Sequence, residues 1–203
     1  MKKNILLVTL ALSSSMAFSQ LALADQEEYR IDNGNSFANW SIRHVASKTS
    51  GTFSDVTGKI LIDRADLSKS SINAKINVLS VNSSNAKRDE HIQKDEYLDA
   101  AKFSEMTFVS SKIAAKNTTE GVVTGTLTLH GVAKQMTFPF KVLGFGQDPW
   151  GGNRMGLEAH TGLKASDFGF AWPLKPNAPV GDDVEITLLI EGVKVPVNNT
   201  PIK

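Results

Sequence analysis

The sequence predicts an all-β domain in which eight antiparallel strands enclose an apolar interior, with one short helix. The first observation is alternation, clearest in residues 71–78, where Ile72, Ala74 and Ile76 share one parity and polar side chains occupy the other. A repeat of two is the period of a β-strand with one apolar face. The second observation is that short polar turns connect such segments, which favours antiparallel pairing. Because one helix cannot cover an eight-stranded sheet, the sheet must close into a barrel or fold over as a sandwich.

Eight segments carry the strand pattern between turn signals: residues 37–45, 52–63, 71–78, 106–111, 122–129, 134–144, 154–164 and 184–193. The fifth and sixth are separated by His130-Gly131, which predicts a tight hairpin. Residues 86–99 contain helix formers and neither Pro nor Gly, and we expect the helix there. Residues 172–179 contain three prolines and cannot lie inside a sheet.

The N-terminus has the features of a secretory signal peptide. Lys2 and Lys3 precede a short apolar run, and Ala22-Leu-Ala24 forms a small-residue cleavage site. The apolar run at residues 5–12 is far shorter than the ~20 residues that span a bilayer, so we expect no membrane-spanning segment. The sequence therefore predicts a signal peptide at residues 1–24, a barrel domain at residues 25–195 and a loose tail at residues 196–203. Export of this kind places the mature protein in the periplasm.

Charge and cysteine content exclude several classes of function. The sequence has 22 Lys and Arg against 21 Asp and Glu, and loss of the two signal lysines leaves the chain nearly neutral. A neutral chain offers no basic surface for nucleic acid. It also has no cysteine, which excludes disulfides and thiol chemistry. No cofactor is predicted.

The inward parity of the strands provides the candidate ligand-binding residues. We expect these side chains to face the interior: Trp40, Ile42, Ile60, Ile62, Ile72, Ile76, Val78, Phe108, Phe138, Phe140, Leu157, Ile186 and Leu188. They could fill a dry core or line a cavity, since eight strands permit either. Small residues among them favour a cavity, and examples are Ala38, Gly58, Ala74, Gly125 and Ala159.

Several stretches, in order along the chain, resemble the YceI-like family of secreted lipid-binding proteins. The most specific are Arg88-Asp-Glu-His-Ile92 and Leu127-Thr-Leu-His-Gly-Val-Ala-Lys134, and Trp40-Ser-Ile-Arg-His44 adds to them. The resemblance covers residues 29 to about 193, and residues 148–152 resemble its periplasmic branch. It implies an eight-stranded lipocalin-like barrel with the helix at one end, and a tunnel that binds an isoprenoid or another long-chain lipid.

Four polar residues are expected at the barrel rim: His44, Arg88, Asp89 and His91. The resemblance favours a role for the last three in pinning the helix, although many charged neighbours would also suit a solvated face. The sequence contains neither a His-Glu-x-x-His motif nor a Gly-x-Ser-x-Gly motif, so we predict a binding protein and not an enzyme.

Alternatives remain open. The protein could be a small enzyme that acts on a lipophilic substrate through His44, Asp89 and His91, or an interaction module whose apolar face receives a partner protein. A homodimer is also left open. Trp150, in a Gly-rich turn, is expected to pack as a plug.

Overall fold

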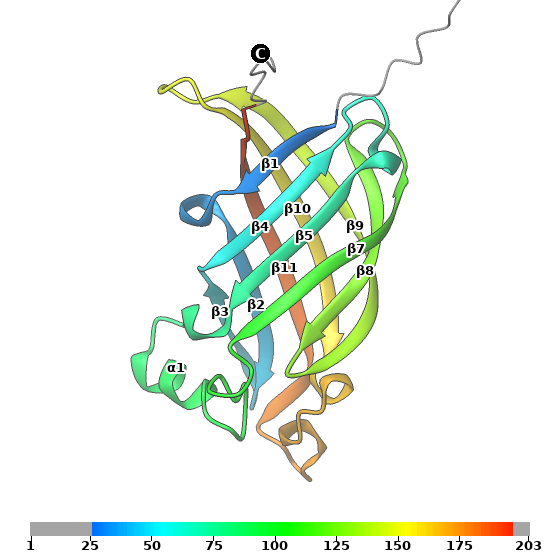
Figure 1. The fold of residues 1–203 in the computed structure, drawn as a ribbon. Helices are drawn as coiled ribbons and strands as arrows, with labels where there is room; N and C mark the ends of the chain where they lie inside the picture. Colours follow the sequence, from blue (N-terminus) through cyan, green and yellow to red (C-terminus); the bar gives the residue numbers. More distant parts are fainter. Residues whose placement is uncertain (1–25, 197–203) are drawn as a thin grey trace, which may run out of the picture.

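The computed structural model describes residues 26–196, in which one continuous antiparallel sheet rolls up into a tall barrel (Figure 1). The predicted signal peptide, residues 1–24, lies outside the described residues, as do residues 197–203 of the predicted tail. The strands are β1 (Glu27–Ile31), β2 (Phe37–His44), β3 (Ser47–Phe53), β4 (Val56–Ile62), β5 (Ser71–Asn77), β6 (Val81–Asn82), β7 (Glu105–Ala115), β8 (Glu120–Leu129), β9 (Val132–Gln147), β10 (Asn153–Lys164) and β11 (Val180–Lys194).

Eight of these strands form a closed ring. Its order is β1-β4-β5-β7-β8-β9-β10-β11, and β11 returns to β1 through pairs such as Arg30 with Val193. Every neighbouring pair in the ring is antiparallel. The α-helix of the described residues, α1 (Ala86–Ile92), lies at one end of the barrel. The predicted eight-stranded antiparallel barrel with a short helix at one end is therefore confirmed.

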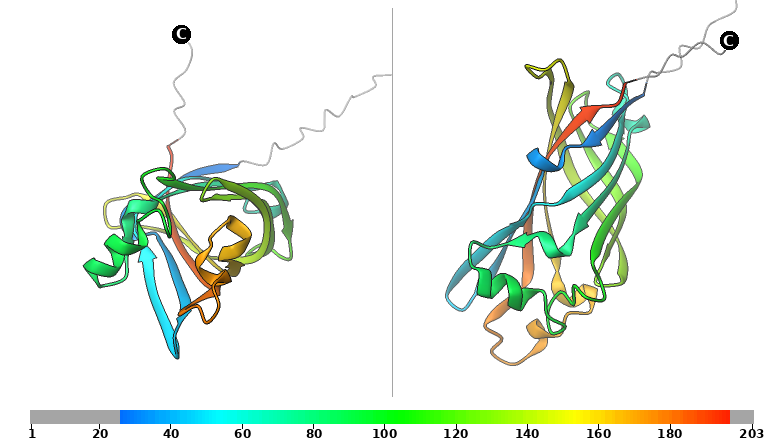
Figure 2. Two further views of the ribbon diagram at one scale, coloured as in Figure 1. Left: turned by 90° about the horizontal axis from the view of Figure 1, so that it is seen from below. Right: turned by 60° about the vertical axis from the view of Figure 1, so that its left-hand side comes forward.

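The other three strands extend the wall at the α1 end. β1 and β2 run one after the other along β11, separated by a 3-10 turn at η1 (Asn33–Asn35). β3 pairs with β2 along its length, but its second edge meets only the two residues of β6. The β2–β3 hairpin consequently projects from the ring, and Figure 2 shows the segment around α1 beside it. At the β1 end β11 pairs with β1 and completes the ring, whereas at the α1 end β11 pairs with β2 of the projecting hairpin.

The predicted strand at residues 52–63 is wrong as a single unit. It contains the end of β3 and all of β4, which break at Ser54-Asp55 and pair with different partners. The sequence carried a signal for this break: Phe53 is odd-numbered, whereas the next inward residues, Val56 and Ile60, are even-numbered. A strand cannot change parity without a break or a bulge. Strands β1 and β6 and the first part of β3 were also missed.

The predicted helix at residues 86–99 is shorter than expected. It begins with Asn85 as N-cap, whose side chain accepts a hydrogen bond from the backbone N–H of Arg88 (3.1 Å), and ends at Ile92. Residues 93–103 then form a series of turns. Tyr97 and Leu98 reach the barrel interior from these turns. Tertiary packing therefore overrides the helix propensity of the charged run.

Further short 3-10 helices join the strands: η2 (Leu67–Lys69), η3 (Val78–Ser80), η4 (Ala165–Phe168) and η5 (Trp172–Leu174). The last two belong to the segment between β10 and β11, which lies across the end of the barrel near α1 when seen from below (Figure 2). Buried residues form two clusters. One surrounds Tyr29 and Ile60, and the other surrounds Leu129 and Phe168, beneath this segment.

Candidate ligand-binding cavity

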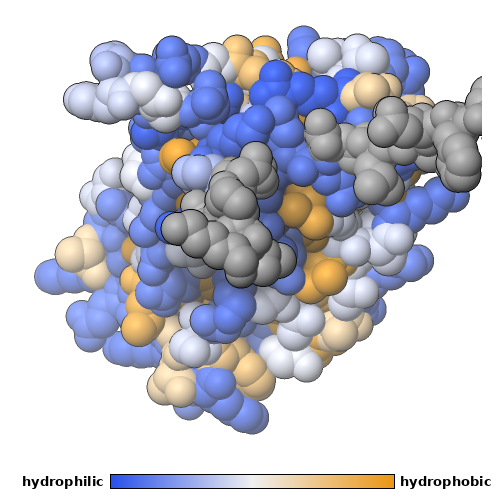
Figure 3. Space-filling view, turned by 45° about the horizontal axis from the view of Figure 1, so that its top comes forward, coloured by the Kyte–Doolittle hydropathy of each residue, from blue (hydrophilic) through white to orange (hydrophobic). Residues whose placement is uncertain are grey.

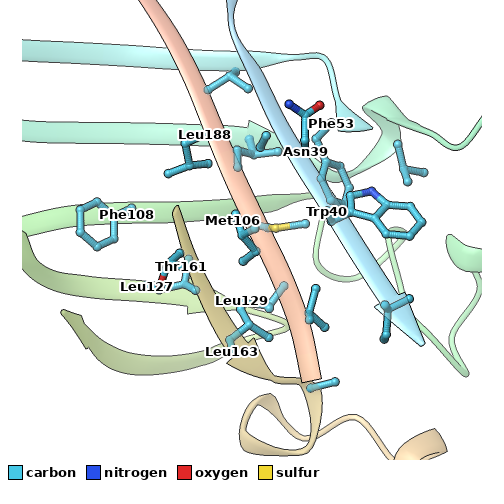
Figure 4. Close-up of a pocket in the computed structure, with 18 of the residues that line it drawn as sticks. Asn39, Trp40, Phe53, Met106, Phe108, Leu127, Leu129, Thr161, Leu163 and Leu188 are labelled. Carbon is cyan, nitrogen blue, oxygen red and sulfur yellow. The ribbon is translucent and has the colours of Figure 1, made fainter. Parts of the chain in front are cut away.

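A cavity of about 440 Å³ occupies the interior of the barrel (Figure 4). Every strand of the closed ring contributes to its lining, as do β2, β3 and α1. The lining is apolar apart from a few hydroxyl, amide, imidazole and guanidinium groups, and no Asp or Glu takes part in it. Binding pockets for small molecules in proteins have volumes of roughly 300–1,000 Å³ and a similar apolar character.

The structure places all but two of the predicted ligand-binding residues along this cavity: Trp40, Ile42, Ile60, Ile72, Ile76, Phe108, Phe138, Phe140, Leu157, Ile186 and Leu188. Ile62 and Val78 are each 2% exposed and do not line it. Ile62 follows the inward parity, but it pairs with Glu27 of β1, beyond the end of the cavity. Val78 follows the end of β5 and enters the turn η3, where it packs in the second buried cluster.

The inward side chains distinguish a cavity from a dry core. Ile72, Ile76 and Leu188 point into the barrel and line the cavity, yet they are only partly buried. Side chains that filled a close-packed interior would have no exposed surface. Gly125 leaves room for the Phe108 ring of the cavity wall, because a Cβ atom at this position would lie 2.5 Å from Cζ of that ring. The interior of the barrel therefore contains space that side chains do not fill.

Charged hydrogen bonds secure the end of the barrel at β1, which we call the closed end. Tyr29 is fully buried, and its hydroxyl donates to Glu27 Oε2 (2.8 Å) and accepts from Arg64 Nη2 (2.7 Å). Lys194 Nζ contacts the other oxygen of Glu27 (2.6 Å). Burial raises the pKa of Glu27, but hydrogen bonds from Lys194, Tyr29 and Arg64 outweigh it and hold this pKa below its usual range.

A second group of charges lies at the same end. Arg154 contacts three carboxylates, those of Asp32, Asp148 (2.8 Å) and Glu191 (2.6 Å). Hydrogen bonds to Asp148, Asp32 and Glu191 raise the pKa of Arg154. Bonds from Asn35 and Arg154 lower the pKa of Asp32. These pairs join the η1 turn, the β9–β10 hairpin and β11, and hydrophilic residues cover much of this face in Figure 3.

Aromatic rings meet at the other end, near α1, which we call the mouth. Six rings form a row in which each neighbouring pair has its centroids 4.5–5.3 Å apart. The row runs in the order His91, Tyr97, Trp172, Phe170, His130 and Phe103. It joins three segments that are distant in sequence: α1 with the chain after it, the β8–β9 hairpin, and the segment between β10 and β11.

The rings of the mouth are the main functional candidates that the sequence analysis missed. Tyr97, Phe170 and Trp172 all line the cavity. Trp172 begins the segment whose prolines exclude it from the sheet, and Phe170 lies two residues before it. No periodic pattern marks either residue. Their signal is aromatic content alone, in a chain with few aromatic residues.

The predicted polar rim is only partly assembled. His44, Arg88 and His91 line the cavity, and Asp89 does not. Arg88 donates from Nε to Ser83 Oγ (2.7 Å) and from Nη2 to the Ser83 carbonyl (2.7 Å), and Asp89 Oδ1 accepts from the Ser83 N–H (2.9 Å). These two side chains tie α1 to the segment before it. His91 Nε2 instead contacts Glu96.

Two further observations concern metal binding and membrane insertion. In residues 26–196, no three or more His, Cys, Asp or Glu side chains gather as a metal site would require. No helix in this range has the length and apolar character needed to cross a membrane. The expectation for Trp150 is wrong: its side chain is 87% exposed at the tip of the β9–β10 hairpin and plugs nothing.

Comparison with known proteins matches the fold and the sequence to one family. The family model described as YceI-like domain matches residues 29–192. The protein YceI of Salmonella newport is 39% identical over 197 residues, which cover 96% of this chain and 99% of that protein. The chain belongs to the YceI-like family.

Solved structures share the barrel of this YceI-like protein. The YCEI protein of Campylobacter jejuni is 29% identical, with a TM-score of 0.64 over 72% of this chain and 85% of that one. BcnA of Burkholderia cenocepacia has a TM-score of 0.71 at 24% identity, over 79% and 98% of the two chains. A polyisoprenoid binding domain from Saccharophagus degradans has a TM-score of 0.62 at 17% identity, over 82% and 98%. The last two likenesses concern the fold.

Proposed function

We propose that this YceI-like protein is a periplasmic carrier or sequestering protein that holds one long apolar molecule, such as a polyisoprenoid or a fatty-acid-like lipid, in its barrel. The observation that carries the proposal is the apolar cavity, which reaches the mouth and whose lining includes no carboxylate. The polyisoprenoid binding domain of Saccharophagus degradans, which has the same fold, supports this class of ligand.

Apolar burial suffices to hold such a ligand. Each buried CH₂ group contributes ~0.8 kcal/mol, so a chain of about 16 carbons gains on the order of 13 kcal/mol. This gain is comparable to the ~4–15 kcal/mol cost of association. A longer isoprenoid gains more. The ligand therefore needs few polar contacts, which agrees with the composition of the lining.

The orientation of the ligand follows from the difference in polar cavity lining between the two ends of the barrel. At the closed end Glu27 pairs with both Arg64 and Lys194, and none of the three lines the cavity. The polar lining residues His44, Arg88 and His91 come from β2 and α1 at the other end. The apolar chain accordingly points toward the closed end, and a polar head group stays at the mouth.

The proposal includes export and the absence of catalysis. Lys2, Lys3 and the Ala22-Leu-Ala24 site support a cleaved signal peptide and a periplasmic address. Against an enzyme, Asp89 is turned to Ser83 and lies outside the cavity, while His91 contacts Glu96. His44, Asp89 and His91, the three groups that an enzyme would use, therefore do not all face a substrate bound in the cavity.

Native mass spectrometry of the mature protein, purified from the periplasm of the bacterium that makes it, tests the proposal. We expect an adduct with the mass of one lipid, and the same spectrum reports whether the protein is a homodimer. The decisive variant is Ala74→Phe, which adds a ring to the cavity wall. Because this ring takes up part of the cavity, we expect the variant to bind less lipid than the wild type. Its control is Asn73→Phe on the same strand, which is exposed on the outer face. The proposal fails if the purified protein carries no lipid and if lipid added to delipidated protein does not bind.

A further inference from the structure

Two loops at the mouth carry exposed apolar side chains. They are the tip of the β2–β3 hairpin, residues 43–48, and residues 171–179 before β11, and we call them the paired loops. Val45 in the first loop is 62% exposed, and Leu174 in the second is 72% exposed. Both side chains lie in water although neither has a polar atom.

Hydrogen bonds join the two loops to each other. The backbone N–H of Val45 donates to the Pro179 carbonyl (2.6 Å). Arg43 Nη1 donates to the carbonyls of Val45 (3.3 Å) and Pro179 (3.4 Å), and Nη2 donates to that of Ala178 (3.0 Å). Figure 2 shows the hairpin beside the segment between β10 and β11, at the same end of the barrel. The paired loops therefore form one surface, and apolar patches on a protein surface mark contacts with a partner or a membrane.

The backbone at Val45 suits a different residue. Val45 and Ala46 form a two-residue turn between the paired residues His44 and Ser47, and Val45 has a φ of 52°. A positive φ is uncommon outside glycine, asparagine and aspartate, and a β-branched side chain there is strained. Strained residues of this kind cluster at functional sites. Val45 thus presents an exposed apolar side chain at the expense of turn stability.

The paired loops carry cations and no carboxylate. Their sequences contain Arg43, Lys48 and Lys175, and neither Asp nor Glu. Among the ion pairs within residues 26–196, Lys48 pairs with Glu185, whereas Arg43 and Lys175 have no acidic partner. Apolar side chains next to such cations are complementary to the surface of a bilayer with anionic lipids.

Carboxylates near the paired loops have partners of their own or lie on other segments. Asp182 accepts from Ser166 Oγ (2.7 Å), and Asp183 contacts Lys164 Nζ (2.8 Å). The remaining acidic residues of the mouth belong to α1 and the turns after it, where lysines accompany them: Glu90, Asp95, Glu96, Lys87 and Lys94. The paired loops are therefore the cationic side of the mouth.

We propose that the paired loops dock on the surface of an anionic lipid bilayer, with Val45 and Leu174 inserted among the head groups. The inference rests on the proposed function. A long apolar ligand is nearly insoluble in water, so its carrier has to collect it from a membrane or deliver it to one. Because His44 and Trp172 of the paired loops line the cavity, docking brings the opening to the bilayer. The lipid then passes between the two without crossing water.

Flotation with lipid vesicles tests the proposal on the mature protein. The vesicles contain phosphatidylcholine alone, or phosphatidylcholine and phosphatidylglycerol in equal parts. We expect the wild type to float with the mixed vesicles and to bind them more tightly than the neutral ones. Leu174→Ser weakens binding to mixed vesicles about tenfold, because an exposed Leu side chain no longer leaves water. Lys175→Gln lowers the preference for mixed vesicles about fivefold.

The sharpest variant is Val45→Asn, because Asn tolerates a positive φ. We expect its melting temperature to equal or exceed that of the wild type, while its binding to mixed vesicles falls roughly three- to tenfold. A structural role alone would give no loss of vesicle binding. Val109→Asn and Leu143→Ser are the matched controls, since both side chains are exposed on strands of the barrel and neither lines the cavity. These controls and Trp150→Ala, at the closed end, keep vesicle binding.

Transfer of a fluorescent fatty acid from loaded protein to mixed vesicles shows whether docking serves the cavity. For transfer by docking, the rate rises with vesicle concentration, whereas release into water gives a constant rate. We expect a rising rate for the wild type. Val45→Asn and Leu174→Ser slow the transfer and keep the affinity for the fatty acid.

A wild type that carries lipid but does not float, or that transfers lipid at a constant rate, overturns the inference while the proposed function stands. Unchanged vesicle binding in both Val45→Asn and Leu174→Ser has the same meaning, as does a loss confined to Trp150→Ala, which would place the contact at the closed end. A protein that takes up no lipid in solution overturns the proposed function itself.

Discussion

The two ends of the barrel use different kinds of contact. At the closed end, Tyr29 is fully buried among Glu27, Arg64 and Lys194, with bonds of 2.6–2.8 Å. At the mouth, rings such as Tyr97 and Trp172 meet at centroid distances of 4.5–5.3 Å and stay partly exposed. Charged hydrogen bonds are directional and specify one geometry, whereas ring contacts tolerate displacement. The difference indicates that the closed end maintains the fold and that the mouth is where a ligand would pass.

The largest expected effect on stability is at the closed end. Tyr29→Ala removes a fully buried ring and leaves Glu27 and Arg64 without their shared partner. We expect the free energy of unfolding to fall by about 3–5 kcal/mol. Urea denaturation followed by circular dichroism measures it. A loss below about 1 kcal/mol would contradict the role assigned to the closed end.

The matched change at the mouth is Tyr97→Ala, which removes two neighbouring ring contacts, to His91 and Trp172. Each aromatic pair contributes about 0.5–1.5 kcal/mol. Loss of about 1.4 kcal/mol from the barrier to opening of the mouth corresponds to a factor of ten, so we expect release of bound lipid to accelerate about tenfold. The free energy of unfolding should fall by less than in Tyr29→Ala. Stopped-flow transfer of a fluorescent lipid to acceptor vesicles measures the release rate. An unchanged rate would show that the lipid leaves elsewhere.

Acid should weaken the closed end. The pKa of Glu27 is lowered in the folded protein, so its ionised form contributes stability that is present above the ordinary carboxyl pKa of about 4 and is lost as the pH falls through the lowered value. At pH 7 we expect Glu27→Gln to melt about 2–4 °C below the wild type. The two melting temperatures should converge below about pH 4. Calorimetry from pH 7 to pH 3 checks this, and a constant difference would argue against it.

The smallest expected effect is at Trp150. Its side chain is 87% exposed and lies on the hairpin of the closed end, outside both the charged contacts and the cavity. Trp150→Ala should change the free energy of unfolding by less than about 0.5 kcal/mol, as is usual for surface positions. It should leave lipid release unchanged. A clear effect on either measurement would show that the hairpin tip contributes to stability or to lipid release, contrary to this prediction.

Individual elements show how far the sequence could predict this molecule. The alternation in residues 71–78 identified β5 and the inward side chains Ile72 and Ile76, because parity is a local property of a strand. The same reasoning misplaced Val78, since a pattern does not show where β5 stops and η3 begins. β6 was missed because two residues are too short to display a period. Asp89 was predicted at the rim because its neighbours in the motif belong there, whereas its own side chain turns to Ser83.

The sequence by itself determined the fold class, most of the inward residues and the family resemblance, because parity and local motifs are properties of short segments. The tertiary structure decided which end closes and which opens. The closed end depends on Glu27 meeting Lys194, and the mouth on Tyr97 meeting Trp172. These partners are far apart in the chain, and only the register of the closed sheet brings them together. The same folding joined Val45 to Pro179 in the paired loops, which no pattern of residues could have shown.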